Sequence, residues 1–117
     1  MRVVVVSRQP LWRDALSALV AAELTADPVV SLDDVSQLAA LHPVADDLIL
    51  LAPPGQTDPG EWIERNVEHL KTGRLVLLPP HKNVRWAKIA YAHGFRALAP
   101  KDTASDLMVA VLRLVVV

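Results

Sequence analysis

The chain has 117 residues, of which 52% are hydrophobic, so it is long enough for one domain with a substantial core. Its formal net charge of −1 argues against the broad basic surface that direct binding of nucleic acid requires. It has no cysteine, which excludes disulfides and thiolate metal sites and is typical of a cytoplasmic protein, and no apolar run is long enough to span a membrane.

Short apolar runs alternate along the chain with amphipathic segments, each bounded by proline, glycine or a polar residue. The apolar runs lack polar alternation, which is typical of strands covered on both faces of a parallel sheet. In chain order, the expected elements are a strand at 2–6, a helix at 10–20, a strand at 29–31, a short helix at 35–41, a strand at 48–51, a helix at 60–70, a strand at 75–78, a helix at 84–93, a strand at 96–99 and a last helix through 107–114.

Polar residues and glycine mark the expected helix ends. Asp33 or Asp34 is expected to cap the second helix, and Asp102 or Thr103 the last one. Gly73 is expected to end the third helix.

Five strands alternating with five helices predict one α/β domain over residues 1–117, a (βα)₅ doubly wound parallel sheet of the flavodoxin-like kind. In such sheets the functional crevice lies at the carboxyl ends of the strands. The residues that follow the strands are therefore the candidate site: Ser7, Arg8, Ala52, Pro79 and Lys101.

The residue that follows the central strand at 48–51, and is therefore expected at this edge, is an alanine. Ala52 can be neither a nucleophile nor a metal ligand. Asp46 and Asp47 precede the strand, so they are expected at the opposite edge of the sheet.

Three segments carry a resemblance to a known family. Residues 3–16 contain the Pro10-Leu11 pair, residues 47–51 form a buried strand followed by Pro54-Gly55, and residues 101–103 read Lys-Asp-Thr. Together they resemble the receiver domains of NarL/LuxR-type response regulators over essentially the whole chain. The resemblance implies the receiver fold and a place in two-component signalling.

The chemistry that this resemblance implies is phosphorylation of an aspartate at the tip of the third strand. Carboxylates would hold Mg²⁺, and a hydroxyl and a lysine would stabilise the added charge. The departures are Ser7 and Arg8 for the metal-binding acids, Ala52 for the nucleophile, Pro79 for the hydroxyl residue and Leu98 for the aromatic that often reports the switch. Only Lys101 matches, so we expect a vestigial pocket with no metal, no cofactor and no enzymatic activity.

Two cations are expected to point toward the vestigial pocket. Repulsion between Arg8 and Lys101 disfavours a divalent cation between them. Arg8 then turns to solvent, pairs with a nearby acid, or shares an anion with Lys101. In the first interpretation both are surface residues, and in the other they form an anion-binding site with Ser7.

The last helix is apolar around most of its circumference. Leu107, Val111 and Leu114 are expected to face the core. The other apolar residues, with two from the fourth helix, form a candidate dimer interface: Val109, Leu112, Val115, Val116, Trp86 and Ile89. The alternative is that these residues pack on a following domain, since the chain stops at Val117 without a capping signal.

No histidine pair has a metal-ligand spacing, and no hydrolase or nucleotide-binding motif is present. His93 is expected to be a partly buried structural residue. The three tryptophans, Trp12, Trp62 and Trp86, are expected either to pack at the periphery of the core or to anchor interfaces.

Residues and resemblance together predict an atypical receiver, or pseudo-receiver, of a bacterial transcriptional regulator. It would act without phosphorylation, through homodimerisation and protein contacts, and DNA would be bound by a C-terminal helix-turn-helix domain of the parent protein. The alternative is a ligand-sensing pseudo-receiver that binds a small anionic metabolite in the former acidic pocket.

Overall fold

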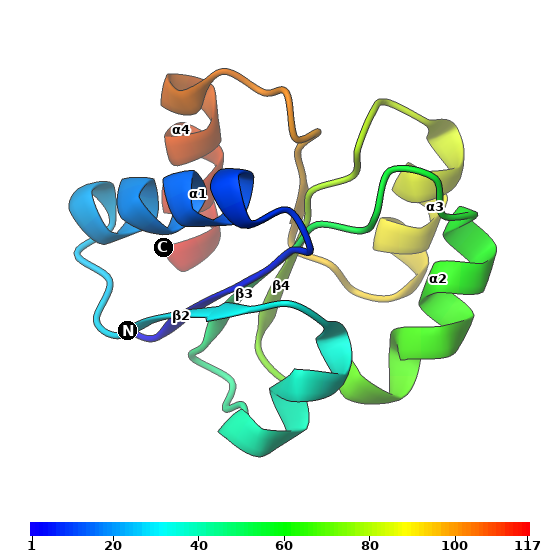
Figure 1. The fold of residues 1–117 in the computed structure, drawn as a ribbon, viewed down its shortest axis with the longest axis horizontal. Coiled ribbons are helices and arrows are strands. Elements are labelled where there is room, and N and C mark those ends of the chain that lie inside the picture. The colour runs from blue at the N-terminus through cyan, green and yellow to red at the C-terminus, as the bar shows by residue number, and fades with distance from the viewer.

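Five parallel strands form one sheet in the order β2-β1-β3-β4-β5 in the computed structural model, which describes residues 1–117 (Figure 1). The strands are β1 (Val3–Val6), β2 (Val29–Leu32), β3 (Leu48–Leu51), β4 (Arg74–Leu77) and β5 (Ala97–Leu98). The helices are α1 (Pro10–Glu23), α2 (Pro59–Asn66), α3 (Val84–Ala92) and α4 (Ser105–Val116), with 3₁₀ helices η1 (Val35–Leu41) and η2 (Val67–His69). The strand order and alternation confirm the expected doubly wound α/β fold.

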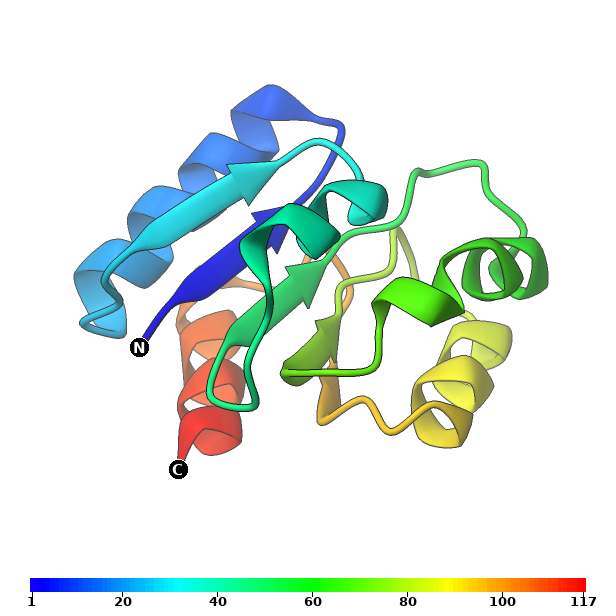
Figure 2. The same ribbon diagram turned by 90° about the horizontal axis from the view of Figure 1, so that it is seen from below.

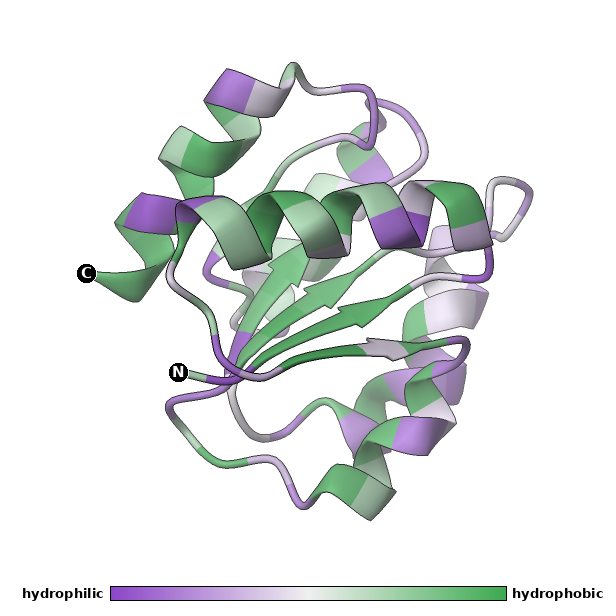
Figure 3. Ribbon diagram, turned by 60° about the vertical axis from the view of Figure 1, so that its left-hand side comes forward, coloured by the Kyte–Doolittle hydropathy of each residue, from purple (hydrophilic) through white to green (hydrophobic).

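The sheet separates two hydrophobic cores, because successive side chains of a strand point to opposite faces. Helices α1 and α4 cover one face, while η1, α2 and α3 cover the other (Figures 1 and 2). In β1, Val3 and Val5 join the first core, and Val4 and Val6 join the second. The strands are hydrophobic along almost their whole length (Figure 3), as burial on both faces requires.

The helix ends differ in part from those expected. The second crossover is a 3₁₀ helix, capped as expected by Asp34, which forms a reciprocal capping box with Gln37. Gly73 does not end a helix: its φ of 105° serves the turn into β4, where an added Cβ would lie 2.8 Å from the Ile49 side chain. Helix α4 begins after Ala104 with no side-chain cap, so the predicted caps at Asp102 or Thr103 are wrong.

No helix combines the length and the apolar character needed to cross a membrane, and the longest, α1, has 14 residues.

A buried ion pair lies at the amino edge of the sheet. Asp47 is only 3% exposed and accepts from the Arg2 guanidinium at 3.2 and 2.5 Å and from the Val44 N–H at 2.9 Å. Burial by itself raises the pKa of the Asp47 carboxyl, but the bonds from Arg2 and Val44 and the charges of Arg2 and Arg74 outweigh burial and lower it. Asp47 is therefore a structural anion at the edge away from the candidate site.

Helix α4 packs against the sheet through the opposite face from the one expected. Leu107 and Leu114 are 57% and 78% exposed. The buried residues are Met108, Val109, Leu112 and Val115. Both faces carry residues at i, i+4 and i+7 spacing, but the buried face is broader and removes more apolar surface from water. The prediction of an outward interface is wrong for Val109, Leu112 and Val115, and Val116 is half-buried against the same core.

The two residues of α3 in the expected interface also face inward. Trp86 is 1% exposed and meets Trp62 edge-on, with ring centroids 5.7 Å apart and an interplanar angle of 71°. Ile89 is half-buried against the same core. His93 is exposed, contrary to expectation, because it is the C-cap residue of α3, where the chain leaves the helix.

The orientation of α4 is tested by a pair of leucines. Leu112→Ala removes a fully buried side chain and is expected to lower the free energy of unfolding by about 2–5 kcal/mol. Leu114→Ala changes an exposed side chain and is expected to cost less than about 0.5 kcal/mol. Urea denaturation of both variants measures the difference, and equal losses would contradict the observed orientation.

Candidate functional site

The carboxyl ends of β1, β3 and β4 meet at one edge of the sheet, as the topology requires. Ser7 is 2% exposed, and its Oγ accepts from the Gln9 N–H at 3.1 Å. The Ala52 N–H donates to the Val6 carbonyl at 3.0 Å, and the Lys101 N–H donates to the Pro79 carbonyl at 2.9 Å. The backbones of all the predicted site residues are therefore neighbours, although their side chains take separate paths.

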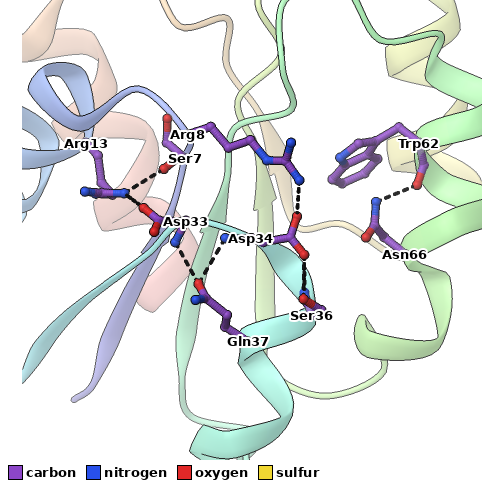
Figure 4. Close-up of polar contacts among 9 residues, drawn as sticks. All are labelled: Ser7, Arg8, Arg13, Asp33, Asp34, Ser36, Gln37, Trp62 and Asn66. Atoms are coloured by element: carbon purple, nitrogen blue, oxygen red, sulfur yellow. Dashed lines mark hydrogen bonds and ion pairs between the residues drawn. The ribbon is translucent and has the colours of Figure 1, made fainter.

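Arg8 pairs with an aspartate and does not share the pocket with Lys101. Its guanidinium donates to Asp34 Oδ1 at 2.9 Å (Figure 4). Bonds from Ser36 and Arg8 lower the pKa of the Asp34 carboxyl to about 2. The second of the three alternatives for Arg8, pairing with a nearby acid, is the one that the structure shows.

A second arginine–aspartate pair lies beside the first. The Arg13 guanidinium contacts Asp33 and donates to the Ser7 carbonyl at 3.0 Å. Arg8 and Arg13 belong to the segment after β1, whereas both aspartates follow β2. The two ion pairs therefore join the β1–α1 connection and the first turns of α1 to the segment after β2 at the carboxyl edge (Figure 4).

Lys101 turns toward α1. Its amino group lies 4.7 Å from the centroid of the Trp12 ring, in cation–π geometry. Burial lowers the pKa of the Lys101 amino group. The expected convergence of Arg8 and Lys101 on one anion is therefore absent, because each cation has a partner of its own.

A polar cavity of about 410 Å³ opens beside Ala52, between η1 and α2. Four of its thirteen lining residues are hydrophobic and eight are charged or polar, so polar and apolar surface both line the walls. The charged and polar members are Arg8, Asp33, Asp34, Ser36, Thr57, Arg65, Asn66 and His69. Ala52 lines this cavity at the tip of β3 and also packs against the core beneath α1 and α4.

No group of three or more histidine, aspartate or glutamate side chains is placed to hold a metal ion. Asp33 and Asp34 are the acids nearest to Ala52 in the cavity, and arginines neutralise both. The arrangement at this edge can bind polar groups, and it presents no nucleophile at the tip of β3.

Comparisons with known proteins agree on the fold. No family model matches the sequence, and no curated protein matches it. The signal receiver domain of the response regulator NarL from Mycobacterium tuberculosis superposes with a TM-score of 0.71 at 22% identity, covering 97% of this chain and 94% of that one. A LuxR-family DNA-binding response regulator from Staphylococcus aureus gives 0.69 at 15% identity, covering 99% and 98%.

A third solved structure is the signal receiver domain of a modulated diguanylate cyclase from Desulfovibrio desulfuricans G20. It gives a TM-score of 0.67 at 15% identity and covers 98% of this chain and 92% of that one. The chain has the receiver fold. Identities this low show a shared fold, so function has to be argued from the site.

Sequence reasoning about this receiver-fold domain missed most of the cavity wall. Thr57, Arg65 and Asn66 lie in and beside α2, a helix for which the sequence predicts only an apolar face toward the core. Asp33 and Asp34 were recognised as caps and not as partners of arginine. The signal that would have found them is strand pairing, because β1 beside β2 brings the residues after both strands together.

The Arg8–Asp34 pair predicts a pH dependence. A carboxyl whose pKa is lowered from 3.8 to about 2 adds stability above its unfolded value, and that stability is lost as the pH falls through the folded value. The Asp34 side chain is 39% exposed, so we expect a contribution of about 0.5–1 kcal/mol.

Asp34→Asn keeps a capping side chain but removes the charge. Urea midpoints at pH 7 and pH 2.5 should therefore differ less for this variant than for the wild type. Asp46→Asn is the control, because the Asp46 side chain forms no ion pair. An unchanged pH dependence in Asp34→Asn would contradict the assignment.

Proposed function

We propose that this receiver-fold domain is a regulatory domain of a bacterial transcriptional regulator that acts without phosphorylation and has no enzymatic activity of its own. The observation that carries the proposal is Ala52 at the tip of the central strand, with the Arg8 guanidinium bound to the nearest aspartate. A phosphoryl acceptor needs an oxygen nucleophile, and the Mg²⁺ that assists it needs oxygen ligands.

The missing nucleophile at position 52 is only one of the differences on which the proposal rests. Restoring an acid at position 52 would place a carboxylate near Arg8 and Asp34, which already form a charged pair. The polar groups nearby are engaged with one another, so a single substitution does not recreate a metal site. This supports a fold whose regulatory output no longer uses the phosphorylation reaction.

Incubation with acetyl phosphate and Mg²⁺ tests this proposal. We expect intact-mass spectrometry to find no phosphoryl adduct on the wild type, and none on Ala52→Asp, because the ligands for Mg²⁺ stay absent. A receiver domain that phosphorylates itself under the same conditions is the positive control. A stoichiometric adduct on Ala52→Asp would show that a competent pocket had lost only its nucleophile.

Contact with other proteins is the first route by which such a domain would act without phosphorylation. The outward face of α4 carries the exposed Leu107 and Leu114 with the half-buried Val111 between them, and Leu114 borders a groove with Ala97 of the edge strand β5. An exposed apolar stripe of this kind suits packing against a second copy of the chain. A symmetric dimer would set the spacing of two DNA-binding domains in the parent protein.

Light scattering of purified protein tests self-association. The double variant Leu107→Asp/Leu114→Asp should convert a dimer to a monomer while it stays folded, because both side chains are exposed. Leu11→Asp places the same charge on another exposed leucine, in α1, and should leave the dimer intact. A monomeric wild type, or equal dissociation by both variants, would contradict this interface.

A second candidate function is the sensing of a small anionic molecule. The observation that favours it is the polar cavity beside Ala52. Of the three residues that the sequence suggests for an anion site, Arg8 lines this cavity, whereas Ser7 and Lys101 do not. The candidate therefore depends on the cavity walls and not on a pair of converging cations.

A further inference from the structure

The cavity beside Ala52 has two chemically different walls. One comes from the segment after β2 and from η1, and it presents Asp33, Asp34 and Ser36 (Figure 4). The other comes from α2 and its flanking segments, and its polar residues are Thr57, Arg65, Asn66 and His69. A molecule in the cavity would therefore meet carboxylates on one side and a guanidinium on the other.

The carboxylate wall is already neutralised. Asp34 accepts from Arg8 through Oδ1 and from the Ser36 backbone N–H and hydroxyl through Oδ2. Asp33 contacts Arg13 through Oδ1, which leaves its other oxygen free to accept. This wall therefore offers acceptor positions for hydroxyl groups and carries no uncompensated negative charge.

The opposite wall carries the unpaired charge. The Arg65 side chain forms neither a salt bridge nor a side-chain hydrogen bond, although Glu61 and Glu64 precede it on the same helix. Asn66 donates its side-chain N–H to the Trp62 carbonyl at 2.8 Å, so its Oδ1 remains an acceptor. An anionic group on a ligand would find its partner at Arg65.

We propose that this cavity binds a small hydroxyl-rich molecule with one anionic group, of the sugar-phosphate or sugar-acid class. Its anion would contact Arg65, and its hydroxyls would donate to the free oxygens of Asp33 and Asn66. The volume of about 410 Å³ lies in the range of small-molecule sites, and walls that are part polar and part apolar suit a sugar, which presents both hydroxyl groups and C–H surface.

The proposal rests on the ligand-sensing candidate and deepens it. It is independent of self-association, because α4 covers the opposite face of the sheet from the cavity. Failure to bind a sugar phosphate would thus leave the acetyl phosphate and light-scattering results unaffected.

Isothermal titration calorimetry of the chain with four probes tests the site. Glucose 6-phosphate carries both recognition elements, glucuronate replaces phosphate by carboxylate, and glucose and inorganic phosphate each carry one element alone. We expect glucose 6-phosphate or glucuronate to bind at least about tenfold more tightly than glucose or phosphate. The tighter of the two identifies the anionic group. No binding by either would overturn the proposal, and so would equal binding of inorganic phosphate.

A variant and its matched control locate the binding. Arg65→Ala should weaken it by about tenfold or more, whereas Arg96→Ala, an equal charge loss at an exposed arginine outside the cavity, should not. Arg65 is exposed, so Arg65→Ala should stay folded, and circular dichroism checks this directly. Wild-type affinity in Arg65→Ala would overturn the proposal.

Discussion

The contact between Arg2 and Asp47 fixes the register on which the site depends. The Asp47 side chain binds Arg2 before β1 and the Val44 N–H, and its carbonyl accepts from the Arg74 N–H of β4 at 2.7 Å. One residue therefore aligns the starts of three strands. Because side chains alternate along a strand, a shift by one residue would exchange the two cores and bring a different side chain than Ala52 to the far edge.

At that far edge, pairs of arginine and aspartate hold a loop and the start of α1 to the segment after β2. Arg8–Asp34 and Arg13–Asp33 link the segment after β1 to the segment after β2. The charges that approach the tip of β3 are thus balanced within the protein itself. The edge keeps a polar cavity and one unpaired guanidinium, which explains why binding is a better supported role for it than catalysis.

The fold could be predicted from the sequence because uninterrupted apolar runs mark buried parallel strands. The orientation of α4 could not, because Leu107, Val111 and Leu114 have the same spacing as Met108, Leu112 and Val115. The partners of Arg8 and Lys101 could not be predicted from the sequence either. Asp34 is near Arg8 only through the pairing of β1 with β2, and Trp12 is near Lys101 only because α1 and α4 share one face of the sheet. The cavity could not be predicted either, because no pattern of residues specifies the space that remains between η1 and α2.

Trp62 connects the cavity wall to the core. It lines the cavity near Ala52, and its ring packs edge-on against Trp86 of α3. The edge-on contact of the two indoles therefore leads from the cavity wall to α3. Displacement of the Trp62 indole would thus shift α3 through side-chain packing, while the Arg85–Asp58 ion pair, at 2.8 Å, holds the starts of α2 and α3 together.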